Sequence, residues 1–265
     1  MKTPVLYKNA AELLKGALFQ VSETVAANQK KTLFREWAEP TTEIARFNIT
    51  VEDNAELEYV LFQNFAATSE ALARIEIVGG RNSRVKLTVV QNGASKSHLE
   101  IVTRCAGEGS EVEIRGLQNA KDSQKFSVDF DAVHSVPHTK SDLQVWCVAR
   151  DSSHSIFSGL VSIKEGAHHT EAYQRNKNLL LSAKATVDSF PKLFIYNDDV
   201  KCAHGSSTST LEPDQFIYMQ SRGIDREQDE QMLTQGFIHQ AIDWISDEQI
   251  RSRLQKSLSV FEEEW

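Results

Sequence analysis

Cysteine and proline are scarce in this 265-residue chain, which has three of the first and five of the second. Cys105, Cys147 and Cys202 are odd in number, widely spaced and without a CxxC pair, so neither a disulfide framework nor a zinc ribbon is indicated. No apolar run approaches the ~20 residues that cross a bilayer. The first residues also lack the continuous apolar core of a secretory signal. These absences predict a cytoplasmic protein with reduced thiols and no membrane association.

An excess of basic residues is missing as well. The 29 Lys and Arg residues are outnumbered by 37 Asp and Glu residues, which gives a formal net charge of −8. Proteins that bind nucleic acid more often carry a basic excess, so a nucleic-acid partner is not expected. The hydrophobic fraction of 40% and the charged fraction of 25% are ordinary for a folded chain.

Several motifs of common enzymes are absent. The sequence contains no GxxxxGK[ST] loop, no GxGxxG turn, no GxSxG elbow and no HExxH helix. The first absence means that ATP chemistry would need another subunit. Together they remove the commonest enzyme classes.

Residues 44–210 alternate between apolar and polar side chains in short segments, for example over residues 47–51 and 84–89. Period-two alternation predicts strands that bury one face. No 12-residue amphipathic stretch interrupts them, which argues against a doubly wound α/β fold. Turns are predicted at the glycine-containing separators, which are Gly79-Gly80, Asn92-Gly93, Gly107 to Gly109, Gly116 and Gly166.

A weak repeat refines this prediction. Residues 84–94 are echoed by residues 111–120, and 27 residues separate both Val85 from Val112 and Asn92 from Asn119. A period in the twenties that contains only strands and turns favours a β-solenoid. A β-sandwich, which also has many short strands but needs no fixed repeat, stays open at this point.

Both flanks differ from this β-rich body. Residues 1–43 form a short N-terminal segment whose apolar stretch fits either helix or strand. After residue 210 the signals are helical: Pro213 suits a first helical position, and Gly223 suits a C-terminal stop. Asp225 with Gln228, and Ser246 with Gln249, fit the capping-box pattern. We therefore predict a β body over residues 44–210 and a C-terminal helical domain over residues 211–265.

Cys202 and His204 form the densest candidate site. If residues 200–204 are a strand, both side chains project to the same side, about 6–7 Å apart. A thiolate and an imidazole on one face suit iron, iron–sulfur clusters, zinc or copper. A Cys/His nucleophile pair without an orienting third residue, or two unrelated strand residues, remain alternatives.

Other histidines are weaker metal candidates. His134 and His138 have the i, i+4 spacing of a helical zinc pair, but Pro137 between them spoils that geometry. The adjacent His168 and His169 would point to opposite faces of a strand, where they could not share a metal.

A carbohydrate-active enzyme is a further alternative. Residues 197–199 followed by His204-Gly205 superficially resemble the acidic and His-Gly motifs of polygalacturonases, β-helical enzymes that use paired carboxylates. Those motifs lie on successive coils in such enzymes, whereas here Asp199 and His204 are only five residues apart, so this alternative is the weakest.

Residues 134–245 resemble the SufB/SufD family of iron–sulfur cluster assembly scaffolds, and its SufD branch in particular. The matching blocks occur in the family's order: HSVPHTKS from His134, SIFSG from Ser155, EAYQRNKNLLLS from Glu171, ATVDSFPKL from Ala185, DDVKCAHG from Asp198 and QFIYMQSRGI from Gln215.

This resemblance implies a right-handed parallel β-helix followed by a C-terminal helical domain. It implies a non-catalytic SufD-like scaffold subunit that pairs with a SufB-like protein, or with itself, and carries a SufC-like ATPase on residues 211–265. It also implies that His204, with Cys202 beside it, takes part in binding transient iron or a nascent iron–sulfur cluster at the subunit interface. No stably bound cofactor is expected. The alternative is a structural or interaction module on the same β-helix that has lost this chemistry.

The chain departs from the family at two points. The usual Cys-Ser-His-Gly-Ala-Thr reads Cys202-Ala203-His204-Gly205-Ser206-Ser207 here. The glutamate that SufB carries in its equivalent of the His-Gly segment is not found. Both departures favour a supporting SufD-type partner over the primary scaffold.

Overall fold

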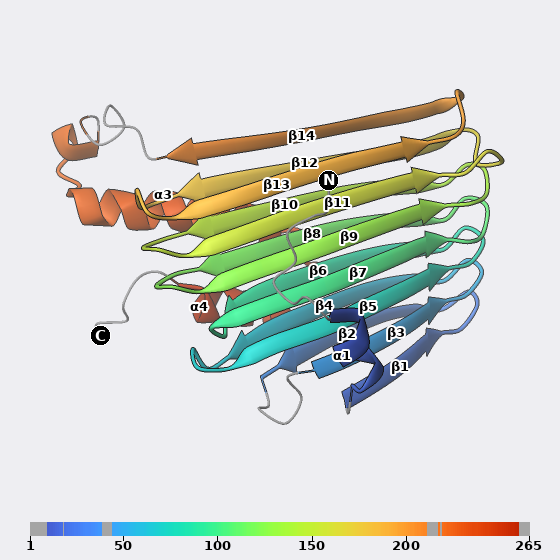
Figure 1. The fold of residues 1–265 in the computed structure, drawn as a ribbon, viewed down its shortest axis with the longest axis horizontal. Coiled ribbons are helices and arrows are strands. Elements are labelled where there is room, and N and C mark those ends of the chain that lie inside the picture. Colours follow the sequence, from blue (N-terminus) through green and yellow to red (C-terminus); the bar gives the residue numbers. More distant parts are fainter. Residues whose placement is uncertain (1–9, 18, 39–43, 211–216, 218, 260–265) are drawn as a thin grey trace.

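A computed structural model describes the chain over residues 10–17, 19–38, 44–210, 217 and 219–259. Its body is a flat parallel β-solenoid in which the chain alternates between two sheets (Figure 1). Sheet A has the strand order β1-β3-β5-β7-β9-β11-β13, and sheet B has the order β14-β12-β10-β8-β6-β4-β2. Every pairing between neighbouring strands is parallel. The predicted parallel β-helix is therefore confirmed, and a β-sandwich is excluded.

The strands are β1 Phe19–Val25, β2 Lys30–Trp37, β3 Ile44–Val51, β4 Glu56–Phe65, β5 Glu70–Gly79, β6 Arg84–Gly93, β7 Lys96–Cys105, β8 Glu111–Ala120, β9 Lys125–His134, β10 Lys140–Ala149, β11 His154–Ile163, β12 Thr170–Leu180, β13 Thr186–Ile195 and β14 Val200–Thr210. The described helices with bounds are α1 Ala10–Lys15, α3 Arg226–Ile242 and α4 Glu248–Ser257. None of the helices in the described part of the chain is long and apolar enough to span a membrane.

The sequence repeat corresponds to the coil of the solenoid. Val85 of β6 is the register partner of Val112 of β8, and Asn92 is the partner of Asn119. The amide nitrogen of Asn119 donates to the side-chain oxygen of Asn92 at 3.0 Å. Identical side chains recur because each coil places them on top of the same position of the coil before.

The inner faces of the two sheets meet in an apolar core. Among its members Phe47, Ile75, Ile77, Leu87 and Leu99 are completely buried. Alternation along each strand produces this core, because one side chain in two points inward. Gly116 also lies there, inside β8, where an added Cβ would approach a methyl group of Val145 to 3.2 Å. The prediction of a turn at Gly116 was therefore wrong.

The β-helix begins earlier than the sequence suggested. Strands β1 and β2 pair in parallel with β3 and β4, so the first coil lies within the segment 1–43 that was expected to precede the body. The side chains of β1 alternate between half-buried and exposed, and only Val25 is fully buried in this outermost strand. On the other side, β14 ends at Thr210. Pro213 lies outside the described residues.

Helices α3 and α4 cover part of the outer face of sheet B. Ile238, Ala241 and Ile242 of α3 pack against outward-facing residues of the sheet such as Phe62 and Trp146. Asp225 and Gln228 form the predicted capping box of α3. The N-cap of α4 is Asp247, which accepts from two backbone N–H groups, and not the predicted Ser246.

Candidate functional site

Cys202 and His204 lie on β14, the last strand of sheet B, and alternation puts both on the same side of that strand. Cys202 is half-buried and packs with Val200 against a small apolar cluster of the last coils. His204 is exposed. The structure therefore brings the two predicted residues together, with the thiol at the edge of the core and the imidazole open to solvent.

The surface beneath His204 is polar. Its register partner on β12 is Gln174, which is 1% exposed. The amide nitrogen of Gln174 donates across the interior to the backbone oxygen of Lys192 at 3.2 Å. Gly159 makes room for this side chain, because an added Cβ there would lie 2.2 Å from its Oε1. Farther along β14, Ser206 donates to Asn176 at 3.4 Å. His204 thus stands over amide groups and not over the apolar core.

The three thiols differ in accessibility. Cys105 and Cys147 are completely buried, and burial raises the pKa of Cys105 to about 11 and that of Cys147 to about 12. Partial burial also raises the pKa of Cys202, while a backbone hydrogen bond at Ala172 acts in the opposite direction. Because thiolate is the form that binds metal, Cys202 would release its proton as a metal ion binds.

The donor set is incomplete within this chain. Across the described residues, no group of three or more His, Cys, Asp or Glu side chains is arranged to hold a metal ion. Cys202 and His204 supply two donors, whereas iron–sulfur clusters and tetrahedral metal sites take about four protein ligands. Any stable coordination here would need further ligands from another molecule.

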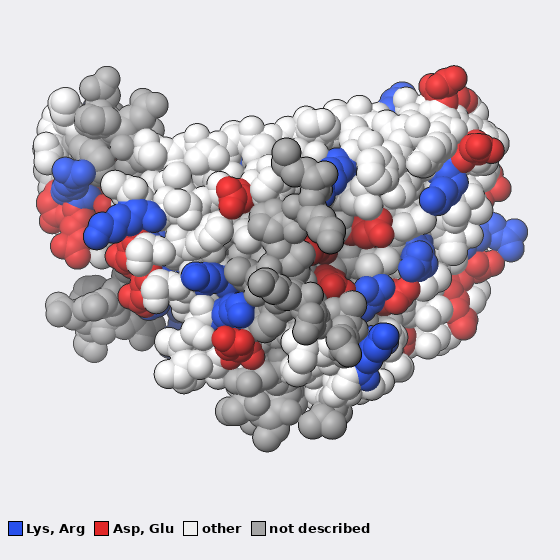
Figure 2. Space-filling view, viewed as in Figure 1, with Lys and Arg blue, Asp and Glu red and all other residues white. Residues whose placement is uncertain are grey.

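The last coil has an open edge within the described part of the chain. Among the described strands, β14 pairs with β12 alone and β13 with β11 alone. From Cys202 to Thr210 the strand carries no Asp, Glu, Lys or Arg, and the long edge that it forms shows little charge except at its right-hand end (Figure 2). Beside it, Phe194, Ile195 and Tyr196 are exposed to 52%, 40% and 61%. Long uncharged edge strands are templates for pairing with another chain.

His134 and His138 do not form a site together. His134 is buried inside the solenoid, where Thr139 and Ser141 hydroxyls lie 2.8 and 2.9 Å from its ring nitrogens. Burial lowers the pKa of His134 to about 4. His138 is exposed on the turn that follows.

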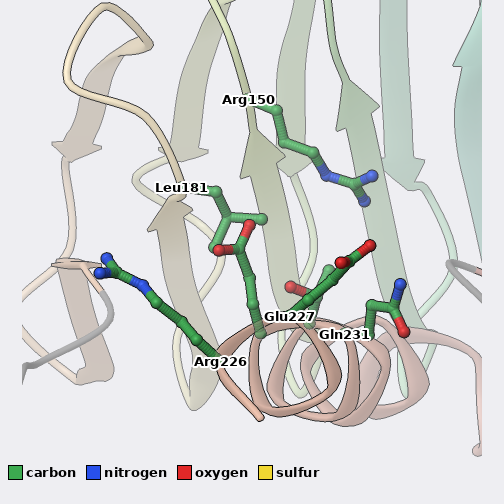
Figure 3. A pocket seen from close by; sticks show the side chains of 7 residues that line it. Arg150, Leu181, Arg226, Glu227 and Gln231 are labelled. Carbon is green, nitrogen blue, oxygen red and sulfur yellow. The ribbon is translucent and has the colours of Figure 1, made fainter. Parts of the chain in front are cut away.

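A cavity of about 430 Å³ lies between α3 and the ends of β10 and β12 (Figure 3). Arg150 reaches into it from the strand side, and Arg226, Glu227 and Gln231 project from the helix. Its lining mixes both signs of charge and includes neither candidate ligand. We therefore regard it as separate from the candidate site.

Comparison with known proteins agrees with the motifs in the sequence. Residues 15–237 match the family model described as "SUF system FeS cluster assembly, SufBD core domain". The chain belongs to the SufBD core family. It is 27% identical to the iron–sulfur cluster assembly protein SufD of Escherichia coli over 210 residues, which cover 79% of this chain and 50% of that protein.

Two further relatives show the same relationship. Identity to SufD of Bacillus subtilis is 29% over 155 residues, which cover 58% of this chain and 36% of that protein. Identity to the chloroplastic protein ABCI7 of Arabidopsis thaliana is 41% over 106 residues, which cover 40% of this chain and 22% of that protein. The chain spans about half the length of E. coli SufD. The comparisons therefore place the chain in the family of these assembly proteins by its SufBD core domain, and a polysaccharide hydrolase is not favoured.

Proposed function

We propose that this chain is a non-catalytic SufD-type scaffold subunit. In this proposal it pairs with a SufB-type chain, or with a second copy of itself, and binds iron or a nascent cluster transiently as cargo at the interface. The observation that carries the proposal is the location of Cys202 and His204, two side chains of metal-ligating types on an open terminal strand that is uncharged from Cys202 onward.

The open edge of β14 supports the docking of another β-rich chain. Adding a strand there would satisfy the unpaired backbone groups and would cover the exposed Phe194 and Tyr196 nearby. Gly205 favours close approach as well, since nothing lies within 4 Å of the position where its Cβ would be. A partner seated along this strand would bring its own side chains next to His204.

Incomplete coordination supports transient binding. One thiol and one imidazole match the soft and borderline ligands that iron and iron–sulfur clusters use. Two ligands alone hold such a cargo weakly, so release requires only separation from the partner's ligands. The rigid ladder beneath β14 would fix the spacing between the two sets of ligands.

The C-terminal helices are the proposed docking site for a SufC-type ATPase. One face of α3 packs against sheet B through Ile238 and Ala241, whereas Met232 of the same helix remains 46% exposed. The chain has no phosphate-binding loop of its own, so nucleotide hydrolysis would have to come from such a partner.

Anaerobic co-expression with SufB-type and SufC-type proteins tests the proposal. The wild-type chain is expected to co-purify with both partners. In the same complex, His204→Ala is expected to lower iron and acid-labile sulfide at least several-fold without preventing assembly. His154→Ala is the matched control, because His154 is another partly exposed imidazole on a strand, paired with Asp188 at 2.9 Å.

A lysine substitution tests the docking edge separately. Ser207→Lys places a charge on the exposed edge strand and is expected to weaken co-purification at least ten-fold, while Thr32→Lys on β2 leaves it unchanged. Failure of the wild-type chain to co-purify with either partner would contradict the proposal. A complex that assembles but carries the same iron and sulfide in wild type and His204→Ala would instead support the interaction module without cluster chemistry.

A further inference from the structure

A row of left-handed backbone positions runs along one rim of the solenoid, at the right of Figure 1, where odd-numbered strands turn into even-numbered ones. In successive coils, residues with φ between 51° and 73° occupy this rim. They are Asn28, Asn54, Asn82, Gly109, His138 and His169.

Glycine adopts this conformation freely, and asparagine, aspartate and histidine are the other residues most often found in it. Four coils use asparagine or glycine, so the turn itself does not require an imidazole. Backbone geometry therefore permits His138 and His169 without selecting them over asparagine. Non-glycine residues in this conformation are often found at functional positions.

Three exposed imidazoles gather at this part of the rim. The ring centroids of His138 and His169 are 4.8 Å apart, those of His168 and His169 are 5.3 Å apart, and those of His138 and His168 are 6.1 Å apart. His168 and His169 lie in a turn and not on a strand. The prediction that they point to opposite faces was therefore wrong.

The two shorter separations are close to those of imidazoles that share one metal ion, and the third, between His138 and His168, is longer at 6.1 Å. With metal–nitrogen bonds of 2.0–2.1 Å and tetrahedral angles, three ring centroids would be about 5 Å apart. As they stand, these rings do not form a group arranged to hold a metal ion, in line with the rest of the described residues, since His138 and His169 are stacked at 28°. The proposal therefore requires the rings to turn toward one point. For exposed side chains such as these, rotation about χ1 and χ2 between staggered wells is a small change.

Carboxylates flank the pair on both sides. Asp199 Oδ2 lies 3.0 Å from Nδ1 of His169, and Glu108 Oε1 lies 3.9 Å from Nε2 of His138. Metal-binding histidines commonly use one ring nitrogen for the metal and the other for a carboxylate. This arrangement leaves Nε2 of His169 and Nδ1 of His138 available.

We propose that His138, His168 and His169 form a surface site for a divalent transition-metal cation of the zinc type. Asp199 orients the ring of His169, and Glu108 lies near that of His138 without a hydrogen bond. Imidazole ligands select zinc, copper or nickel over magnesium and calcium. The site is distinct from Cys202 and His204 and does not depend on the function proposed for them.

Titration of the untagged chain with Zn²⁺ by calorimetry, and with Co²⁺ by visible absorption, tests this site. The wild-type chain is expected to bind one equivalent at the rim. The double variant His138→Asn/His169→Asn should bind it at least ten-fold more weakly. Asparagine is the residue that the equivalent turns already use, so the fold should be retained. His168→Asn, which is not at a left-handed position, provides a second variant if the double variant is unstable.

Two controls locate the bound metal. His154→Asn removes an imidazole–carboxylate pair elsewhere and should leave binding unchanged. The double variant Cys202→Ala/His204→Ala should also retain the rim equivalent, even if the cluster-related proposal fails. The inference is overturned if the rim variants bind as the wild type does, if no Zn²⁺ binds, or if all binding disappears in Cys202→Ala/His204→Ala.

Discussion

The two ends of the solenoid differ in the charge that their strands carry. At the first coil, charged side chains line the strands: Lys31 and Arg35 pair with Glu23, and Arg253 of α4 pairs with Glu36 of β2. At the last coil, β14 is uncharged from Cys202 onward. Charged side chains on an edge strand discourage pairing with other chains. We expect from this comparison that the first edge resists pairing and that the last edge is the one on which the proposed partner docks.

The interiors of the two ends differ as well. Near the start, Trp37 packs edge-on against Phe47 and Phe65, with ring centroids 6.1 and 5.0 Å away. Near the end, Gln174 and Asn176 occupy the inner face beneath β14. Aromatic packing gives the first coils an apolar core of their own, whereas the last coil presents polar groups on an open face.

The largest expected effect is on the free energy of unfolding. It concerns two positions in one column of inward-facing side chains that are register partners from coil to coil. Ile77 is completely buried, and its column continues through Thr103, Ala132 and Val161 to the half-buried Leu193. Ile77→Ala should cost about 2–5 kcal/mol of unfolding free energy. Leu193→Ala should cost about 1 kcal/mol, because less apolar area is buried there. Urea unfolding measures both, and equal losses would contradict the contrast.

The next effect is the pH dependence that His134 causes. Its pKa is about 4 in the folded chain, against the ordinary histidine value of 6.5 that applies once the chain unfolds, so the unfolded chain binds the proton more readily. Stability from the neutral ring is therefore complete above about pH 6.5 and is lost as the pH falls toward 4, by about 3 kcal/mol in total.

Urea unfolding at several pH values measures this effect. His134→Gln should remove this part of the pH dependence, whereas His204→Gln should retain it because His134 stays in place. If His134→Gln unfolds with the wild-type pH profile, the burial of His134 is not the cause of the effect.

The smallest expected effect concerns thiol reactivity. In the folded chain Cys202 should react with a disulfide reagent, slowly because its pKa is raised. Cys105 and Cys147 should react only after unfolding, since both are buried. Counting reactive thiols in native and denatured protein, with Cys202→Ala as the control, measures this. If more than one thiol reacts in the native protein, Cys105 or Cys147 is accessible to the reagent, which would contradict their burial in the core.

Much of this fold could be predicted from the sequence, because its coils repeat. Alternation identified the strands, the spacing of Val85 and Val112 gave the coil length, and Asp225 marked the start of α3. These signals could be read from the sequence because each lies within one or two coils, and the structure confirms the β-helix that they predicted.

Features that depend on neighbouring coils could not be predicted in the same way. Gly116 was wrongly predicted to lie in a turn. A single sequence does not distinguish a turn glycine from one that packs under a side chain of the neighbouring coil. The rim cluster was missed because His138 and His169 are far apart in the chain and meet only through the coil repeat. A signal was present: both residues take the place of asparagine or glycine in equivalent turns.

Hydrogen–deuterium exchange of the chain with and without a SufB-type partner tests the central claim most directly. The account predicts new protection confined to the last coil, residues 186–210, with β4 to β8 unchanged. Protection of the first coil or of the outer face of sheet A instead, or no change anywhere, would contradict the claim that the open terminal coil is the docking edge.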